Sequence, residues 1–420
     1  MTDILDIATR FEPDAESAEP FGSGNINDTY LIRAHNGGKL ILQRINQSVF
    51  PYPKLIMANM RAMMEHVATQ PAPSVPRWEL PQVVPTRNGQ DYVIDADDEF
   101  WRAITFVENA RTYPKVKDAR HAGEAGFALG TFQRLISDLD IGTLHDTLPG
   151  FHIMPHYLQN YDQGLPTFES GVSDRARENR ERAEIRYGIQ VVAERRAWAT
   201  VLQDALAIGQ LRERPIHGDP KIDNIMIDDE SGRAVSIIDL DTVKPGLVQY
   251  DIGDCLRSSC NPLGEDTLEI DQVTFEPDLC ESILRGYLPE VRQFYSPEDY
   301  GYLFDSVRVL AFEMGLRFFT DYLKGDVYFK VRYPEHNLNR AMVQWHLMES
   351  IEAQEPQIRK MIRSLSDTSY ATRPCPTAPW QASSSDKRPK QSQSPAPRGF
   401  GWRCWSSLSS PDGRCSMQRR

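Results

Sequence analysis

The first third of the chain consists of short apolar runs separated by turn residues. Residues 28–35 (DTYLIRAH) and 38–46 (GKLILQRIN) are rich in β-branched and long aliphatic side chains. The NGG turn between them contains glycines that can adopt positive φ, so the pattern predicts a β-hairpin. Residues 50–69 carry apolar side chains at helical spacing after a proline-marked start, and residues 82–107 predict two more strands around a turn. These segments predict a small α+β lobe.

From about residue 117 the hydrophobic pattern becomes helical. Helices are predicted over residues 118–139, 173–211, 277–288, 299–323 and 337–365. Two short strands around residues 225–239 interrupt them. We therefore expect an α+β protein of two lobes, with a β-rich N-terminal lobe at residues 1–110 and a larger, mainly helical C-terminal lobe at residues 111–370.

Residues 371–420 differ in composition from the rest of the chain. They are rich in Ser, Pro, Arg and Gln with few aliphatic residues, so they cannot bury enough apolar area to become ordered. They hold nine basic and two acidic side chains, whereas residues 1–370 hold 38 basic and 57 acidic ones. We expect a disordered basic tail. A shifted reading frame at the end of the gene and a basic interaction segment both remain open as its origin.

Charge and cysteine content narrow the class of protein. The formal net charge of -12 argues against nucleic-acid binding, because affinity for the phosphate backbone requires a basic surface. No signal-peptide pattern and no uncharged stretch of membrane-spanning length are present, so we expect a cytoplasmic protein without membrane association. Six cysteines without zinc-ligand spacing predict free thiols in a reducing compartment. The oligomeric state stays unknown.

Polar residues crowd one turn in the segment IHGDPKIDNIMID at residues 216–228. Phosphoryl transfer to a hydroxyl needs a carboxylate that takes the proton, oxygen ligands for Mg²⁺, and a cation near the γ-phosphate. Asp219 is the candidate base. Asn224 follows it at the interval that separates the catalytic Asp from the metal-binding Asn of protein kinases. Lys221 can reach the transferring phosphate as a compact charge.

A further carboxylate follows in AVSIIDLD, residues 234–241. This run and NIMID form a predicted hairpin that places Asp239 at the end of its second strand, where protein kinases carry the aspartate that holds Mg²⁺. Asn224 and Asp239 are therefore candidate metal ligands. Asp and Asn in turns commonly serve backbone hydrogen bonds, but their joint occurrence at kinase spacing favours catalysis. Asp223 and Asp241 are expected to be structural, and His217 to brace the loop.

These segments resemble the aminoglycoside phosphotransferase and choline kinase superfamily, and within it most resemble the N-acetylhexosamine 1-kinases. GSGNINDTYLI, LILQRINQSVF, FTDYLKGDVYF and HNLNRAMVQW add to the similarity in the same order, from about residue 20 to residue 365. The resemblance implies a protein-kinase-like fold with a nucleotide between the lobes, and ATP and Mg²⁺ as cofactors. It also makes Asp219 the base, and it implies that Asp251, Asp254 and Arg257 support the catalytic loop.

The glycine-containing loop GSGNINDTY is the candidate cover of the nucleotide phosphates. Gly22 and Gly24 leave room for phosphate oxygens, although a plain turn is equally compatible with the sequence. Asn25 is a candidate phosphate contact at the position where the resembled sugar kinases commonly have His. The hinge that contacts adenine is expected near ITFVENA, residues 104–110.

The strand that carries a phosphate-binding lysine in protein kinases has none in KLILQRIN. Arg44 is the candidate substitute, on the same face as Leu40 and Leu42 if the strand alternates regularly. Gln43 is the competitor, because a register shift by one residue would exchange their faces.

The acceptor would bind beside Asp219. The resemblance implies that Arg317 and Tyr328, in GLRFFTDYLKGDVYF, face a hexosamine. The structural alternative is a helix that ends near Gly325, with Arg317 in an ion pair. Trp345 fits either an aromatic platform or the core, and core is the commoner role.

The sequence thus predicts a phosphotransferase with an alcohol group as acceptor, a sugar 1-kinase that binds a nucleotide and a small-molecule sugar. The anomeric hydroxyl of an N-acetylhexosamine is the expected acceptor. Two alternatives stay open: an aminoglycoside- or choline-type phosphotransferase, and a kinase-like protein that binds nucleotide without turnover.

Overall fold

The structure is a computed structural model that describes residues 3–22, 26–73, 75–171 and 174–367. All of these residues fall within one compact unit. The predicted tail at residues 371–420 lies outside the described residues.

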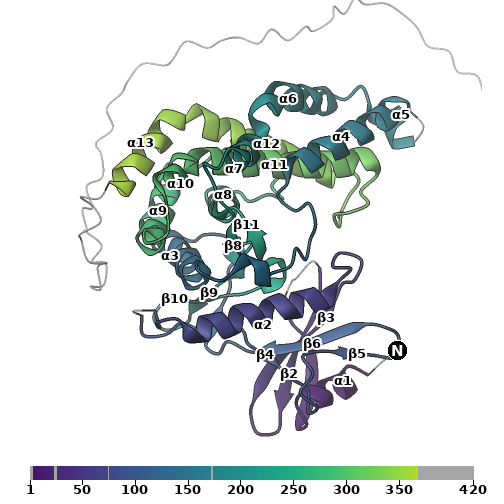
Figure 1. Cartoon of the computed structure of the whole chain (residues 1–420). Coiled ribbons are helices and arrows are strands. Elements are labelled where there is room, and N and C mark those ends of the chain that lie inside the picture. The colour runs from purple at the N-terminus through teal and green to yellow at the C-terminus, as the bar shows by residue number, and fades with distance from the viewer. Residues whose placement is uncertain (1–2, 23–25, 74, 172–173, 368–420) are drawn as a thin grey trace, which may run out of the picture. The chain divides into compact units, whose positions relative to one another are not determined.

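The N-terminal part is an antiparallel sheet with one helix on each face (Figure 1). Its elements are α1 (Ile4–Phe11), β1 (Ala15–Pro20), β2 (Asp28–Ala34), β3 (Lys39–Ile45), α2 (Pro53–Thr69), β4 (Val83–Val84), β5 (Val93–Ile94) and β6 (Phe100–Thr105). The strands run in the order β1-β2-β3-β6-β4, and β5 pairs with β6. The predicted hairpin is confirmed: Ile32 pairs with Leu40 across a turn in which Gly37 has φ +83°.

The two faces of this sheet pack against different helices. Leu40 and Leu42 of β3 face α1, in a cluster with Ile7 and Phe11. Ile45 faces α2 and the C-terminal part. The sequence did not indicate β1, because its segment AESAEP is largely polar and partly exposed at the sheet edge, where a strand needs few apolar residues.

The C-terminal part is mainly helical, as predicted. Its helices are α3 (Ala119–Ile136), α4 (Met154–Glu169), α5 (Asp174–Asn179), α6 (Ala183–Ala199), α7 (Val201–Ala207), α8 (Val248–Ser259), α9 (Pro277–Val291), α10 (Pro297–Gly301), α11 (Leu303–Lys324), α12 (His336–Ala353) and α13 (Glu355–Ser366). Short 3-10 helices in the described part of the chain lie at Ile141–Thr143, Ile222–Asn224, Leu240–Thr242 and Ile270–Gln272. The sequence pattern did not indicate α4, and Pro356 divides the last predicted helix in two.

Two small antiparallel sheets interrupt the helices and carry the loops of interest. One has the order β10 (Ala234–Ile237), β9 (Ile225–Asp228), β7 (Ala110–Arg111), and the other pairs β8 (Arg214–Ile216) with β11 (Lys244–Gly246). The predicted strands around residues 225–239 are therefore confirmed. Because β7 follows β6 and pairs with β9, it fastens the chain leaving the N-terminal sheet to the C-terminal part.

Helices α3 and α9 approach each other more closely than side chains would allow. A Cβ on Gly286 would lie 2.0 Å from the carbonyl oxygen of Gly123, and one on Gly126 would lie 2.0 Å from that of Ile283. Glycine at these positions lets the two helix backbones touch.

We expect Gly286→Ala to lower the free energy of unfolding by about 1–3 kcal/mol, because the added methyl group would meet backbone atoms that cannot move aside. Urea titration followed by circular dichroism measures the change. Gly301→Ala is the matched control, since a Cβ at that helix end meets nothing within 4 Å. Equal stabilities of the two variants would contradict the close contact.

Candidate functional site

The loop between β8 and β9 carries the predicted base and is fixed by its glycine. Gly218 has φ +89°, and a Cβ on it would lie 2.7 Å from the carbonyl oxygen of Thr242. Thr242 Oγ1 donates to the carbonyl of His217 at 2.7 Å. The turn at residues 240–242 and the loop that begins at His217 therefore hold each other in place.

A buried carboxylate on α8 supports the same loop. Asp251 is fully buried and accepts the backbone N–H groups of His217 at 2.9 Å and Gly218 at 2.8 Å. Gln133 of α3 donates to it at 2.9 Å. Three donors thus fix this carboxylate, and it fixes the start of residues 217–224, the candidate catalytic loop. The supporting role expected of Asp251 agrees with this geometry.

His217 is a neutral brace in this structure. Its Nδ1 accepts the backbone N–H of Asp219 at 3.2 Å, and its Nε2 donates to the carbonyl of Ile238 at 2.9 Å. An Nδ1 that accepts cannot carry a proton, so the ring is the neutral Nε2–H form. Burial lowers the pKa of His217 and favours the same form, although Asp251 and Asp219 oppose it.

The lowered pKa of His217 predicts a pH effect on stability. Below pH 6.5 the unfolded chain binds a proton at this histidine before the folded chain does, so stability falls as the pH is lowered from about 6.5. Urea titrations at pH 7.5 and 5.5 should show a smaller difference in the His217→Gln variant than in the wild type. Nitrogen-15 NMR of histidine-labelled protein should find Nδ1 of His217 unprotonated at pH 6, and a doubly protonated ring would contradict the assignment.

Asp219 and Lys221 form an accessible ion pair. Lys221 Nζ lies 3.0 Å from Asp219 Oδ2, and the two side chains are 36% and 30% exposed. Asp219 raises the pKa of Lys221 most, against burial and with help from Asp223 and Asp239. The lysine is therefore a firmly held cation beside a carboxylate that solvent, and an acceptor, can reach.

Asn224 links the candidate catalytic loop to the segment that carries Asp239. Its Nδ2 donates to the carbonyl of Asp219 at 2.7 Å, and its own carbonyl accepts the N–H of Ile238 at 2.8 Å. Asp239 then adopts a left-handed conformation with φ +65°. Such a conformation is uncommon outside glycine and is tolerated best by Asn and Asp. The chain thus brings the candidate base and both candidate ligands to one place.

Loss of hydration, together with the neighbouring Asp241 and Asp219, raises the pKa of Asp239 to about 7 against Lys221 and Arg102, although the residue is exposed. The carboxylate of Asp239 makes no hydrogen bond to another described residue, and Asn224 has committed only its amide nitrogen. One carboxylate and one amide oxygen fit Mg²⁺, which keeps several waters and takes its other ligands from phosphates. Within the described residues no group of three or more His, Cys, Asp or Glu could hold a metal by itself.

The structure corrects the assignment of Arg44. Arg44 shares a strand face with Leu40 and Leu42, as the alternation predicted, but α1 covers that face. Its guanidinium forms ion pairs with Asp28 and Glu99, the latter at 3.3 Å. Arg44 therefore does not join the other candidate residues, because a β-strand directs successive side chains to opposite faces.

The opposite face of β3 carries Gln43, which joins a buried network. Gln43 Oε1 accepts two hydrogen bonds from Arg102 of β6, at 3.0 and 2.8 Å. Arg102 is 2% exposed and forms an ion pair with Asp241. Asn27 Nδ2 donates to the other carboxylate oxygen of Asp241 at 2.7 Å. Asp241, expected to be structural, therefore connects its own segment, which carries the candidate ligand Asp239, to two other parts of the structure. These are the end of the glycine-containing loop, through Asn27, and the N-terminal sheet, through Arg102.

The sequence contains one sign that Arg102 is a buried charge with a partner. A charged residue stands in the middle of the apolar run FWRAITFV, and a buried charge requires a partner. Gly22 has φ +78°, a conformation that suits a glycine loop. Gly24 and Asn25 lie outside the described residues.

The expected hinge is lined by an apolar cluster. Val107, Met226 and Val235 are buried together, with Ala110 and Ile238 against them. Val107 follows β6, and Met226 lies two residues after Asn224. This cluster joins the hinge segment to the strands that flank the candidate metal ligands.

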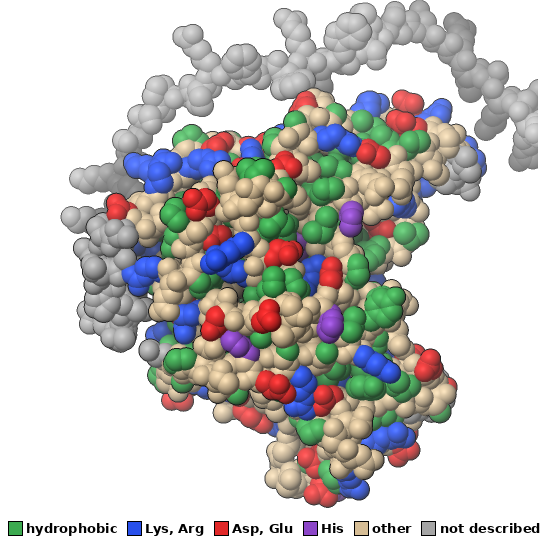
Figure 2. Space-filling model, viewed as in Figure 1, with side chains coloured by type: hydrophobic (Ala, Val, Ile, Leu, Met, Phe, Trp, Pro, Cys, Tyr) green, Lys and Arg blue, Asp and Glu red, His purple; other side chains and the backbone are tan. Residues whose placement is uncertain are grey.

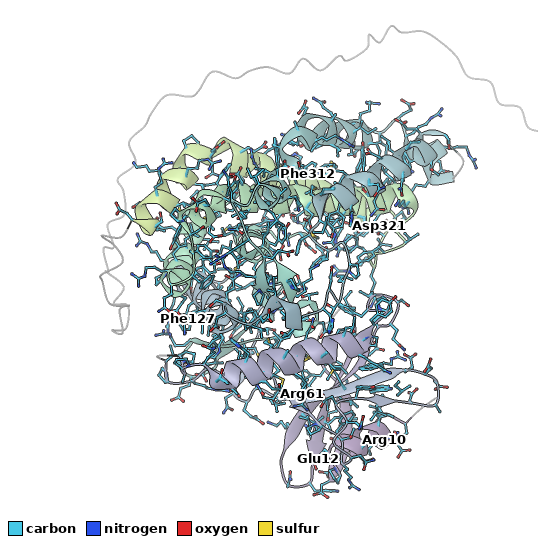
Figure 3. The ribbon with its side chains drawn as sticks, viewed as in Figure 1. Arg10, Glu12, Arg61, Phe127, Phe312 and Asp321 are labelled. Atoms are coloured by element: carbon cyan, nitrogen blue, oxygen red, sulfur yellow. The ribbon has the colours of Figure 1, made fainter. Side chains whose placement is uncertain are left out.

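Arg317 of α11 lies on the stretch between Phe312 and Asp321, which Figure 3 labels on that helix. Its guanidinium carbon lies 5.1–5.4 Å from the centres of three rings, those of Phe151, Tyr157 and Phe329. The Glu313 carboxylate is 3.9 Å away, and Met314 sulfur accepts one hydrogen bond at 3.3 Å. Among the described residues no closer acceptor engages Arg317, so most of its donors stay available.

Arg317 is close enough to Asp219 to interact with it electrostatically. Burial opposes its charge, but Tyr157, Glu313, Tyr328 and Asp219 together raise the pKa of Arg317. Tyr328 is 52% exposed and belongs to a loop whose N–H groups at residues 327–329 all donate to Asp321. Asp219 and Tyr328 therefore both lie within electrostatic range of Arg317, and Trp345 lies in the core with no exposure.

Comparison with known proteins gives a family and a set of similar folds. A family model described as the phosphotransferase enzyme family matches residues 17–288. An aminoglycoside phosphotransferase from Alicyclobacillus acidocaldarius has a similar structure, with 12% identity and a TM-score of 0.55 over 87% of this chain and 97% of that one. A microcompartment-associated aminopropanol kinase shares 16% identity with a TM-score of 0.56, over 84% and 97% of the two chains.

An amicoumacin kinase solved with AMP-PNP and Ca²⁺ is also similar, with 15% identity and a TM-score of 0.52 over 84% of this chain and 92% of that one. At these identities the likeness concerns the fold, and it confirms the predicted kinase-like α+β fold with a β-rich N-terminal lobe. No described helix has both the length and the apolar character that crossing a membrane requires. On the face drawn in Figure 2, acidic and basic side chains are interspersed.

Proposed function

Because the chain belongs to the phosphotransferase enzyme family, we propose that it is a small-molecule kinase that transfers the γ-phosphate of ATP to a sugar hydroxyl. The acceptor in this proposal is the anomeric hydroxyl of an N-acetylhexosamine. The observation that carries it is an accessible Asp219 held 3.0 Å from Lys221, with the cation of Arg317 within electrostatic range of the same carboxylate.

In the proposed reaction Asp219 orients the acceptor hydroxyl and takes its proton as the oxygen forms a bond to the γ-phosphorus. The bond from that phosphorus to the bridging oxygen breaks, and ADP leaves. Lys221, held 3.0 Å from Asp219, is positioned to neutralise charge on the transferring group. Mg²⁺, when bound with the nucleotide, would offset charge on the phosphate oxygens, and Asn224 and Asp239 would hold it.

The nucleotide would lie against the apolar cluster of Val107, Met226 and Val235, with its phosphates toward Gly22 and Lys221. A purine ring gains from an apolar wall, while its polar edge can bond to backbone groups of the hinge. The buried Arg102 would act at a distance, through the Asp241 carboxylate that it holds.

The nature of Arg317 supports a neutral, oxygen-rich acceptor. A guanidinium with spare donors between aromatic walls suits hydroxyl and amide oxygens, and it would repel an ammonium group. Tyr328 adds an exposed ring and hydroxyl within electrostatic range of Arg317. An N-acetylhexosamine offers several acceptor oxygens and an apolar ring face.

A second candidate rests on the acidic side of the same site. Asp223 lies near Asp219 and Glu265, since burial and then these two carboxylates raise the pKa of Asp223 against Lys221. Such a grouping would attract an amine, as in an aminoglycoside- or choline-type phosphotransferase. A kinase-like protein without turnover is disfavoured by the intact set of Asp219, Asn224 and Asp239.

A phosphoryl-transfer assay over a panel of acceptors tests these candidates. The purified full chain is mixed with ATP and Mg²⁺ and with N-acetylglucosamine, N-acetylgalactosamine, glucose, ethanolamine, choline or kanamycin, and ADP release and product mass are followed. An acid-labile sugar phosphate supports the 1-kinase proposal. Turnover with amines alone overturns it in favour of the second candidate, and nucleotide binding without any transfer favours the non-catalytic alternative.

A further inference from the structure

A buried histidine outside the catalytic loop contacts it directly. His152 lies in the loop just before α4 and is 2% exposed. Its Nδ1 lies 2.9 Å from Oε1 of Glu313 on α11, and its Nε2 lies 2.8 Å from the carbonyl oxygen of Gly218.

The two partners determine the protonation of this ring. The Gly218 carbonyl can only accept, so Nε2 of His152 must donate to it, and a proton must also lie between Nδ1 and the Glu313 carboxyl group. The pair therefore holds one more proton than a neutral histidine beside an ionised glutamate. Burial opposes this charge, but Glu313, the Gly218 carbonyl and Asp254 raise the pKa of His152 above its ordinary value.

The ring is held on every side. His152 has φ +64°, an uncommon conformation for a residue other than glycine. Its N–H donates to Tyr157 Oη at 3.2 Å, and its carbonyl accepts from Gln203 at 2.9 Å. The imidazole stacks on Tyr250, with ring centres 5.1 Å apart and planes at 22°. A side chain restrained in this way can hold the group that it contacts, the Gly218 carbonyl, in a fixed position.

The peptide that joins Gly218 to Asp219 is hydrogen-bonded on both sides by histidines, one that accepts and one that donates. The neutral His217 accepts its N–H, and His152 donates to its carbonyl oxygen. Because residue 218 is glycine, the peptide that follows it can rotate more freely than a peptide after any other residue. Such a rotation would move the Asp219 carboxylate away from its position in the site. Two fixed partners remove that freedom.

We propose that His152, held by Glu313, is a positioning residue that fixes the orientation of Asp219 through the Gly218 carbonyl. Glu313 also lies one helical turn before Arg317, with its carboxylate 3.9 Å from that guanidinium. The Glu313 carboxylate thus contacts both Arg317, the cation proposed to bind the acceptor, and His152, which contacts the candidate catalytic loop. The inference rests on the proposed role of Asp219 as base.

Two substitutions of His152 separate positioning from simple support. The amide nitrogen of Gln can occupy the place of Nε2 and keep a donor toward Gly218, whereas that of Asn occupies the place of Nδ1 and keeps only the Glu313 contact. We expect kcat per folded molecule to fall about 10- to 100-fold in His152→Asn, with the KM for ATP unchanged, because a small misplacement of a catalytic group is costly. His152→Gln should recover the greater part of kcat.

Hydrogen exchange gives a second measurement that does not depend on turnover. In His152→Asn the amides of residues 217–224 should exchange faster than in the wild type, while those of β9 and β10 keep their rates. This result would stand even if no acceptor were phosphorylated, so failure of the proposed function can be told apart from failure of the inference. His66→Asn is the matched control. That histidine also pairs with a carboxylate, Asp138 at 2.9 Å, but neither residue belongs to or contacts the loop at residues 217–224.

A wild-type kcat and wild-type exchange in His152→Asn would overturn the proposal. Equal losses of kcat in His152→Asn and His152→Gln, together with equal falls in thermal stability, would also overturn it in favour of a purely structural role.

Discussion

Replacing Asp219 with Asn is expected to lower kcat by about 10²–10⁴-fold while nucleotide binding is kept. The amide is nearly isosteric with the carboxylate but cannot accept the proton of the attacking hydroxyl. The loop should keep its shape, because its contacts with His217 and Asn224 use the backbone of residue 219 rather than its side chain. Steady-state kinetics gives kcat, and calorimetric titration with ADP or AMP-PNP gives the nucleotide affinity.

Loss of the ion pair with Lys221 is the main side effect of this change, and it is small for groups as exposed as these. Asp229→Asn is the control, since Asp229 lies in the exposed turn between β9 and β10 and pairs with Arg111. The control should retain kcat within about twofold, as surface changes away from the site usually do. Full activity of Asp219→Asn would rule out Asp219 as the base.

Asp239→Asn is the second change with a large expected effect, on the dependence of activity upon metal. A neutral amide binds Mg²⁺ far less well than a carboxylate, so kcat/KM should fall at least about 100-fold, consistent with the several kcal/mol that a bound cation supplies. Initial rates over a series of Mg²⁺ concentrations should show saturation shifted to higher concentration or absent.

A measurement of thermal stability shows whether the fall in kcat/KM of Asp239→Asn comes from weaker metal binding or from unfolding of the variant. Loss of hydration and neighbouring carboxylates raise the pKa of Asp239 to about 7, so at pH 8 without metal its ionised form opposes folding. Asp239→Asn removes that charge, and the melting temperature of the nucleotide-free variant at pH 8 should equal or exceed that of the wild type. This difference should shrink toward pH 5, where the wild-type carboxyl is protonated. An unchanged Mg²⁺ dependence would exclude Asp239 as a ligand.

Local sequence was a good guide to elements whose side-chain pattern matches one regular structure. The hairpin of β2 and β3 has a glycine turn between two apolar runs, and α2 begins at a proline, so short-range preferences and burial agree. Element β1 was missed because an edge strand needs little apolar patterning. Helix α4 was missed as well, in a stretch with a weak apolar pattern.

The residues of the candidate site show the same division between what local sequence predicts and what it does not. Asp219, Lys221 and Asn224 are five residues apart at most, so one short loop must bring them together, and their spacing predicts their chemistry. Asp239 follows across a hairpin that the sequence also indicates. Chain connectivity alone places these four near one another.

What only the tertiary structure decided are the contacts between residues far apart in the chain. The face of β3 that Arg44 occupies depends on where α1 packs, and the cation that serves this region, Arg102, reaches Asp241 across 139 positions of sequence. His152 meets Gly218 across 66 positions, and Glu313 meets His152 across 161. No periodicity records such pairings, because each residue's partner is chosen by how the helices and sheets pack. The sequence by itself determined which chemistry the central loop carries, and packing determined which distant side chains hold that loop in position.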